Sequence, residues 1–303
     1  MSAAAFCCGL ILWGSFGFFA MKLYTYFIGS LNLSVETDFS VHFTKSDLNF
    51  FRPALAGKKN VSVRIDEMAE LPAAPLYSSE TERFRVWGSN DIEYRLYTNA
   101  ATGNYFALSR FYRDRDYIIV SVCPAHEYRE FAIWSYCHLE ELLLDNQAIV
   151  LHSASIVYRG KAILFSAPSG TGKTTHSDLW REYVPGVSDI NGDRTLLQLY
   201  ENTWYACGFP ASGSSVYCKQ AAVPIYAIVV LRQASYNRVT ELTDAQKMIC
   251  LYSESTVFSE NPENVSKAMD LLENLIGRVR VLMLECTPEK SAVDILYDYL
   301  YRR

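Results

Sequence analysis

A short loop between an apolar run and a helix-forming segment constrains this chain more than any other feature. Residues 167–174 read A-P-S-G-T-G-K-T, after the apolar run 162–165 and before a segment, 174–182, that can be helical. A glycine-rich turn that leaves a strand exposes successive backbone N–H groups, and the helix adds its positive N-terminal end. Because both features attract anions, we predict a phosphate-binding loop here.

The residues of this loop have distinct expected roles. The candidates to contact a nucleotide are Ala167, Pro168, Ser169, Gly170, Thr171, Gly172, Lys173, Thr174 and Thr175. Lys173 would reach the β- and γ-phosphates, and the Thr174 hydroxyl would ligate Mg²⁺. The loop differs from G-x-x-x-x-G-K-[ST] only at Ala167, which a tight turn tolerates if its φ is negative. The alternative, a plain glycine-rich turn, is disfavoured by the strand–loop–helix setting.

Charge and cysteine usage exclude several classes of protein. The chain has 303 residues, half of them apolar, which suffices for one large domain or two ordinary ones. A net charge of −5 and the lack of a long basic stripe argue against a nucleic-acid partner. Eight cysteines without a C-x-x-C pair indicate reduced, mostly buried thiols. We expect no dedicated protein-bound metal, only Mg²⁺ carried by a nucleotide.

The N-terminal residues 1–20 form an uncharged, largely apolar leader. About 20 such residues could span a bilayer. A signal peptide fits less well, because no basic region precedes the apolar run. A start at Met21 is favoured, since the residues after it resemble the first strand of a soluble domain. We therefore predict a cytoplasmic protein, with a membrane anchor that leaves the rest facing the cytoplasm as the alternative.

The remaining chain divides into two parts. Residues 21–126 form a β-rich N-terminal module without a catalytic motif. Its expected strands are residues 22–30, 39–43, 61–65, 82–87, 92–98, 105–109 and 117–122. Residues 127–303 form the domain that carries the loop. It opens with helical spacing over 127–146, where His138 is expected to be a half-buried helix residue rather than a ligand.

Strand and helix signals alternate through the second domain. The runs 148–152 and 162–166 flank a turn at 158–161, which predicts an antiparallel pair rather than a βαβ crossover. Further strands are expected at 187–190, 195–200, 203–207, 223–231 and 279–285, and helices at 242–253, at 261–277 and after Thr287 as N-cap. The predicted fold class is α/β, in the sense of α+β, with a mixed sheet.

Three side chains are candidates to act beside the loop. Asp193 follows an apolar run and could serve a metal or a nucleophile, although residues 191–193 also have the composition of a turn. His152 falls roughly opposite the loop entrance if the two strands pair, where it could contact a γ-phosphate or polarise a nucleophile. Arg232 could stabilise charge on a transferred phosphoryl group, or simply close its strand. Asp189 is a weaker candidate in a strand interior, and His176 is expected to face solvent.

Five segments in sequence order resemble the catalytic domain of HPr kinase/phosphorylase. They are Leu151-His152-Ser153-Ala154, residues 160–166, residues 169–175, Gly192-Asp193 and Gly208-Phe209-Pro210. The resemblance covers roughly residues 130–301 and is closer to the HPr-kinase-like proteins of bacterial peptide-modification gene clusters. The wider fold is shared with ATP-dependent phosphoenolpyruvate carboxykinase. The order of His, loop, Asp and Gly-x-Pro is more specific than the loop alone.

The resemblance implies a kinase that uses ATP and Mg²⁺ to phosphorylate a hydroxyl, usually a serine of a protein or peptide. In that family the histidine contacts phosphate, and two adjacent aspartates supply the base and metal functions. This chain has Gly192-Asp193-Arg194, so one aspartate is missing. If Asp193 holds Mg²⁺, the base is unassigned; if Asp193 is the base, Thr174 alone holds the metal from the protein side. The family's second signature is not recognisable, and the N-terminal module does not resemble the regulatory domain of HPr kinase.

Two other functions stay open. The missing aspartate favours a non-catalytic ATP-binding adaptor, whose β-module would recognise a peptide partner. Carboxykinase chemistry is disfavoured, because the chain is short for that enzyme and lacks an obvious ligand set for Mn²⁺. Under the leading hypothesis the partner is a protein or peptide substrate, a homo-oligomer is compatible, and a membrane is a partner only if residues 1–20 are an anchor.

Overall fold

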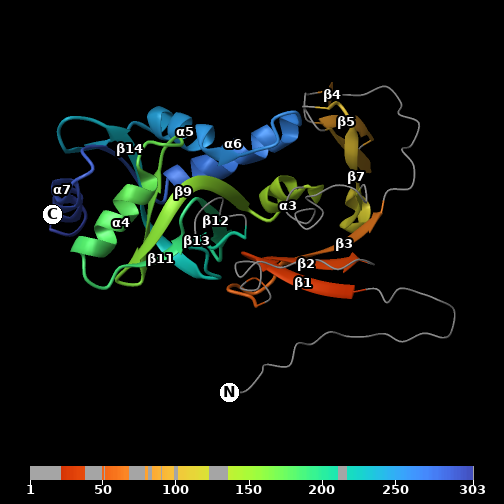
Figure 1. The fold of residues 1–303 in the computed structure, drawn as a ribbon, viewed down its shortest axis with the longest axis horizontal. Helices are drawn as coiled ribbons and strands as arrows, with labels where there is room; N and C mark the ends of the chain where they lie inside the picture. The colour runs from red at the N-terminus through yellow and green to blue at the C-terminus, as the bar shows by residue number, and fades with distance from the viewer. Residues whose placement is uncertain are drawn as a thin grey trace, which may run out of the picture. The chain divides into compact units, whose positions relative to one another are not determined.

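The computed structural model describes residues 22–37, 50, 52–67, 79–80, 84–89, 91–98, 102–122, 136–210 and 217–302. The leader 1–20 and the strand expected at 39–43 therefore lie outside the described residues. The protein is a mixed α/β chain with two mixed sheets (Figure 1), so the predicted class is confirmed. It divides into two units: Met1–Phe27 with Leu31–Phe51 and Gly57–Leu139, and Ile28–Ser30 with Arg52–Ala56 and Glu140–Arg303.

The first unit is built on one sheet. Its strands are β1 (Lys22–Ile28), β2 (Leu31–Thr37), β3 (Lys59–Glu67), β4 (Ser79–Glu80), β5 (Phe84–Gly88), β6 (Ile92–Thr98), β7 (Tyr105–Tyr112) and β8 (Tyr117–Val122), in the order β1-β2-β3-β8-β7-β6-β5-β4, with the short 3-10 helix η2 (Arg113–Arg115) between β7 and β8. The pairs β2–β3 and β3–β8 are parallel, and the pairs from β8 to β4 are antiparallel. Strand β2 was missing from the sequence prediction, although its buried Leu31, Leu33 and Val35 alternate with polar residues as a half-buried strand requires.

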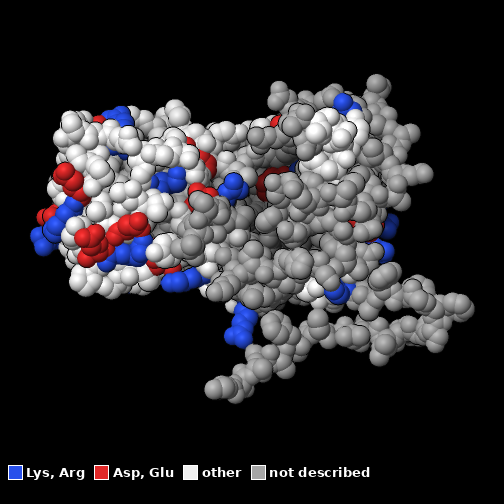
Figure 2. Space-filling model, viewed as in Figure 1, with Lys and Arg blue, Asp and Glu red and all other residues white. Residues whose placement is uncertain are grey.

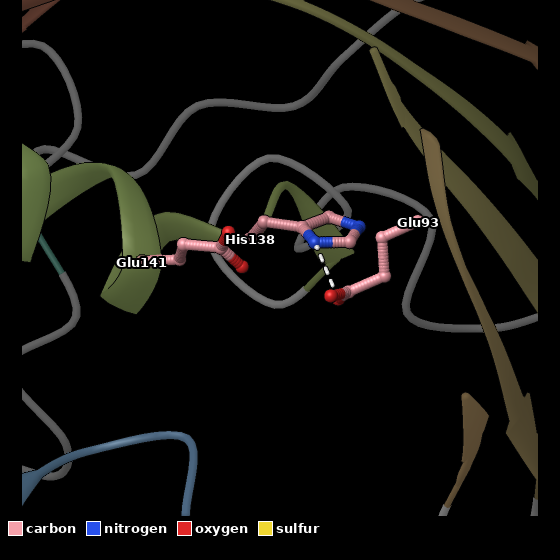
Figure 3. Close-up of side chains that lie close together, drawn as sticks. All are labelled: Glu93, His138 and Glu141. Atoms are coloured by element: carbon pink, nitrogen blue, oxygen red, sulfur yellow. Dashed lines mark ion pairs between the residues drawn. The ribbon is translucent and has the colours of Figure 1, made fainter. Parts of the chain in front are cut away.

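A charged network lies inside this first unit. The Glu93 carboxylate is 2.6 Å from both Arg95 Nε and Arg113, and 3.4 Å from His138 Nδ1. Figure 3 draws the Glu93–His138 pair; the third side chain drawn there, Glu141, belongs to the second unit. Burial raises the pKa of Glu93, but the hydrogen bond from His138 and the charge of Arg95 outweigh it and hold the pKa well below its usual range. Arg95 and Arg113 thus already neutralise the Glu93 carboxylate, so we interpret this charged network as structural.

The sequence prediction for His138 was wrong. It has a φ of 50° and precedes helix α3 (Leu139–Asp145), and it is fully buried rather than half-buried on a helix. Its Nε2 lies 2.7 Å from the Ser109 hydroxyl. Inside the first unit, Ser109 and Glu93 are polar partners of the His138 ring, and they offset the energetic cost of burying it. Helical spacing alone could not reveal this burial.

The second unit contains the other sheet. Its strands are β9 (Ala148–Tyr158), β10 (Lys161–Ser166), β11 (Ser188–Asn191), β12 (Arg194–Tyr200), β13 (Thr203–Cys207), β14 (Ala222–Gln233), β15 (Arg238–Glu241), β16 (Ser255–Thr256) and β17 (Arg280–Cys286). The order is β10-β9-β12-β13-β14-β17-β15, with β11 and β16 paired to β9 and β10 also paired to β14. The predicted antiparallel arrangement around the turn is confirmed, since β9 and β10 pair from Tyr158–Lys161 to Ser153–Ser166. The paired part of β9 is residues 153–158, whereas the predicted run 148–152 pairs with β12.

Helices cover both faces of this sheet. They are α4 (Lys173–Tyr183), α5 (Asp244–Ser253), α6 (Pro262–Ile276) and α7 (Lys290–Tyr301). Because side chains alternate across a strand, Leu164 and Val230 pack into the core with α5 and α6. Their neighbours Phe165 and Val229 pack into the opposite core with α4 and α7. The loop after β10 therefore leaves a strand that is buried on both faces, which is a rigid support.

The helix ends test three sequence predictions. Thr243 and Gln246 form the expected capping box of α5, and α6 begins with Asn261 as N-cap and Pro262 at its first position. The prediction for α7 was wrong, because its N-cap is Glu289 rather than Thr287. The Thr287 backbone N–H instead donates to Asn237 Oδ1 at 2.8 Å, which keeps that residue outside the helix.

The surface around α4 and α7 carries both signs of charge (Figure 2). Arg181 pairs with Asp178 and Asp189, and Lys290 pairs with Asp294. The described part of the chain contains no helix that is both long and apolar enough to cross a membrane.

Candidate functional site

The predicted loop lies between β10 and α4, as the sequence indicated. Gly170 and Gly172 have φ of 78° and 117°, values that side-chain-bearing residues rarely adopt. A Cβ built on either glycine would meet no described atom within 4 Å, so open space lies over the loop. Ala167 is fully buried and is not among the described residues with positive φ, which meets the condition for replacing glycine.

The first turn of α4 faces this open space. Gly172 is its N-cap and offers no side-chain acceptor to the helix N–H groups. Thr174 and Thr175 are exposed in the same turn. The N–H groups of this turn and the Thr174 hydroxyl are thus available to an anion and to the metal that accompanies it.

Lys173 is held over the loop. Its Nζ donates to the Ala167 carbonyl at 2.7 Å and to that of Pro168 at 3.4 Å, and the residue is 7% exposed. Burial lowers the pKa of Lys173, while the negative charges of Glu254 and then Asp193 act in the opposite direction. An ammonium that contacts backbone carbonyls can exchange them for phosphate oxygens.

His152 and Asp193 meet beside the loop. His152 lies within β9 rather than at its end, directly before Ser153, which pairs with Ser166. The Ser166 hydroxyl donates to the His152 carbonyl at 3.1 Å, so the last residue of β10 touches this position. His152 Nε2 is 3.3 Å from Asp193 Oδ1. Two residues that the sequence indicated as candidates beside the loop are therefore neighbours.

The segment before Asp193 is a turn as well as a support for the site. Asn191 is 1% exposed, and its Oδ1 accepts from the backbone N–H groups of Asp193 and Arg194 at 3.0 and 2.9 Å. Its Nδ2 donates to the Phe209 carbonyl at 2.9 Å. The two interpretations of this segment are thus compatible, because the turn aims the Asp193 side chain at His152.

Glu254 completes the group and was missed from the sequence. Its Oε2 lies 2.9 Å from His152 Nδ1, and its side chain is 13% exposed. Glu254 is the C-cap residue that follows α5. Its carbonyl accepts from the His152 N–H at 2.8 Å, next to the residues through which β16 pairs with β9. A carboxylate at the negative end of a helix is locally unfavourable, which was the available signal that Glu254 has a partner elsewhere.

Arg232, the third sequence candidate, is placed differently. The Arg232 guanidinium binds the buried Glu285, which also accepts from Tyr236 and Arg238. The hydrogen bonds from Arg232 first, and then from Arg238 and Tyr236, lower the pKa of Glu285 to about 2. The neighbouring Gln233 reaches the loop instead, with Nε2 3.3 Å from the Thr171 carbonyl.

His176 does not face solvent, contrary to expectation. It is 3% exposed, its Nε2 lies 3.0 Å from Cys286 Sγ, and its ring is near Phe165. Helical spacing from Lys173 places it on the inner face of α4 beside Trp180. The cysteines that the structure describes form no disulfide, and all but Cys250 are buried.

The fold and the site together define an α/β unit with a strand–glycine-rich loop–helix element and a His–carboxylate group beside it. No protein-family model matches the chain, and no curated protein sequence matches it either.

Proposed function

We propose that this protein is an ATP-dependent kinase, similar to HPr kinase, that phosphorylates a hydroxyl of a protein or peptide, most simply a serine. The observation that carries the proposal is the convergence of His152 and Asp193 beside Lys173 and the glycine-rich loop. A phosphate-binding loop alone would support only nucleotide binding. A carboxylate next to it adds a group that can take a proton from a nucleophile.

Each loop residue has a role in holding the nucleotide. The N–H groups of residues 170–175 would surround the phosphates, and Lys173 would exchange the Ala167 carbonyl for the β- and γ-phosphates. Gln233 steadies the loop from β14. Arg232 has no part in this proposal, because Glu285 engages its charge.

One side chain of the loop can hold Mg²⁺ together with the phosphates. The exposed Thr174 hydroxyl stands in the first turn of α4, the position from which a threonine of such a loop ligates the metal that the nucleotide carries. Bound Mg²⁺ would neutralise charge on the β- and γ-phosphates. We assign Thr174 to the metal and Asp193 to the acceptor hydroxyl, since Asp193, with 31% of its side chain exposed, is open to an entering substrate.

Replacing Lys173 tests the nucleotide site. We expect Lys173→Ala to weaken binding of ATP·Mg²⁺ by about 100-fold or more, because a charge-assisted contact to phosphate is lost together with the charge balance of the loop. Isothermal titration with ATP·Mg²⁺ measures this directly. Lys219→Ala, at an exposed position in the same unit, is the matched control and should bind as the wild type does. Equal ATP affinity for Lys173→Ala and the wild type would contradict the site.

Transfer of the γ-phosphate tests the kinase assignment separately. Radiolabelled ATP is incubated with serine-containing peptides and with the protein or its Asp193→Asn variant. We expect labelled peptide with the wild type, at least about 100-fold less with Asp193→Asn, and similar ATP affinity for both. Normal ATP binding without transfer to any peptide would instead identify an ATP-binding adaptor.

A further inference from the structure

Asp193 has no second acidic residue beside it in the sequence, but the site contains a second carboxylate that comes from elsewhere in the chain. Glu254 reaches it from the end of α5, far along the chain from Asp193. The His152 ring stands between the two: Nδ1 faces Glu254 at 2.9 Å and Nε2 faces Asp193 at 3.3 Å. Burial lowers the pKa of Lys173, and the negative charges of Glu254 and then Asp193 act on that pKa in the opposite direction. Glu254 therefore belongs to the same group of side chains as the loop lysine.

The backbone positions Glu254 for this contact. The Glu254 carbonyl accepts from the His152 N–H at 2.8 Å, and Ser255 pairs with Leu151. The same two residues are thus joined through backbone and side chain. The shorter, more buried side-chain contact is the one to Glu254, and the longer, more exposed one is to Asp193. A short, buried contact at one ring nitrogen fixes the orientation of a histidine and leaves the other nitrogen accessible to a second group.

We propose that Glu254 is a positioning residue that holds His152 as the Nδ1–H tautomer, so that the Nε2 lone pair faces Asp193. This inference rests on the proposed kinase function for its role in catalysis, although the tautomer itself does not. The hydrogen bond made by one ring nitrogen decides which nitrogen carries the proton. An ionised carboxylate is an acceptor only, and a neutral imidazole ring has one N–H to donate. Glu254 and Asp193 therefore compete for that proton, and the shorter contact, from Nδ1 to Glu254, places it on Nδ1.

The tautomer has a consequence for phosphoryl transfer. As the acceptor oxygen bonds to the γ-phosphorus, the bond from that phosphorus to the β–γ bridging oxygen breaks, and its electron pair leaves with ADP. The hydroxyl proton passes to the Asp193 carboxylate and is shared with His152 Nε2. The Glu254 carboxylate stabilises the positive charge that this places on the ring. The His152–Glu254 pair thus supports a single aspartate, and the proton leaves to solvent after product release.

The tautomer can be read in the free protein. Long-range ¹H–¹⁵N correlation spectra of the imidazole rings distinguish Nδ1–H from Nε2–H, and the His152→Gln variant assigns the signal among the five histidines. We expect Nδ1–H in the wild type and Nε2–H in Glu254→Ala, because Asp193 is then the stronger acceptor. Glu254→Gln, whose neutral amide oxygen accepts from Nδ1–H less strongly, should return only part of the population to the wild-type form. A wild-type ring protonated at Nε2 alone, or at both nitrogens, would overturn the proposal.

Kinetics separate a positioning residue from a ligand of the nucleotide. With a peptide that the wild type phosphorylates, we expect Glu254→Ala to lower kcat by about 100-fold while the KM for ATP stays within about twofold. Glu254→Gln should recover part of the rate. A loss of ATP·Mg²⁺ affinity like that of Lys173→Ala would make Glu254 a nucleotide or metal ligand and refute the positioning role. If the wild type transfers no phosphate, the kinase proposal fails, while the spectra still decide whether Glu254 orients His152.

Discussion

A single buried amide determines where the Asp193 side chain points. Asn191 Oδ1 accepts two backbone N–H groups, and its Nδ2 binds the Phe209 carbonyl, so three backbone groups depend on it. We expect Asn191→Ala to lower the free energy of unfolding by about 2 kcal/mol, because buried polar groups then lack partners. Urea unfolding measures this change.

Activity should fall in Asn191→Ala as well, because the turn no longer aims Asp193 at His152. Asp193→Asn is the matched control, since it keeps the turn and removes only the charge. Its stability should stay within about 0.5 kcal/mol of the wild type. If Asn191→Ala were as stable as the wild type, the amide would not be what shapes this turn.

Residues near the loop in sequence could be chosen as candidates from local patterns, whereas the only signal for Glu254 was its place at the C-terminal end of a helix. His152, Lys173 and Asp193 lie in or beside short patterns whose chemistry is local. Glu254 enters the site only because β16 pairs with β9, and a two-residue strand leaves no periodic signal. His176 was misplaced because the sequence did not show which face of α4 packs against the sheet; in the structure that face meets Cys286 of β17.

At the scale of elements, helix α4 connects the loop to the core. Its inner face buries His176, Ser177 and Trp180, and Trp180 packs near Phe165 of β10. Any change to this face should therefore be transmitted to the first turn, where the nucleotide would bind. The strand–loop–helix element was predicted well because hydrophobic periodicity and the glycine pattern agree in it.

The burial of His176 should make α4 sensitive to pH. Burial lowers the pKa of His176 to about 4, against about 6.5 for an unfolded histidine. Above pH 6.5 both states are neutral and stability is full. As pH falls from 6.5 to 4 only the unfolded state takes up a proton, so the free energy of unfolding should fall by up to about 3 kcal/mol.

Urea unfolding at pH 7 and pH 5 tests this dependence. His176→Asn, which cannot take up a proton in this range, should lose less stability between the two values than the wild type. The Glu93 carboxylate contributes a separate loss at lower pH, because its folded-state pKa is depressed and its unfolded value is about 4.5. An identical pH dependence in wild type and His176→Asn would show that His176 is not buried as a neutral ring.

At the scale of the whole molecule, the chain forms two units with separate cores. Trp87, Leu96 and Leu108 make a core in the first unit, and the second has a core on each face of its sheet. Short segments from early in the chain join the second unit: the Ser30 N–H donates to Gln198 Oε1, and the Asn146 side chain donates to the Ser30 hydroxyl. No sequence pattern could show this exchange, because it depends on single hydrogen bonds between residues far apart in the chain.

Calorimetry of the full chain should resolve these units and locate the nucleotide. We expect two unfolding transitions, of which ATP·Mg²⁺ raises only the one that belongs to the second unit. At 100 times Kd the ligand adds about 2.7 kcal/mol, which corresponds to roughly 5–10 °C for a unit of this size. The Lys173→Ala variant should show both transitions and no shift, while Trp87→Ala should lower the other transition alone. If ATP raised the temperature of both transitions, nucleotide binding would stabilise the first unit as well. The expectation that the nucleotide acts on the second unit alone would then be wrong.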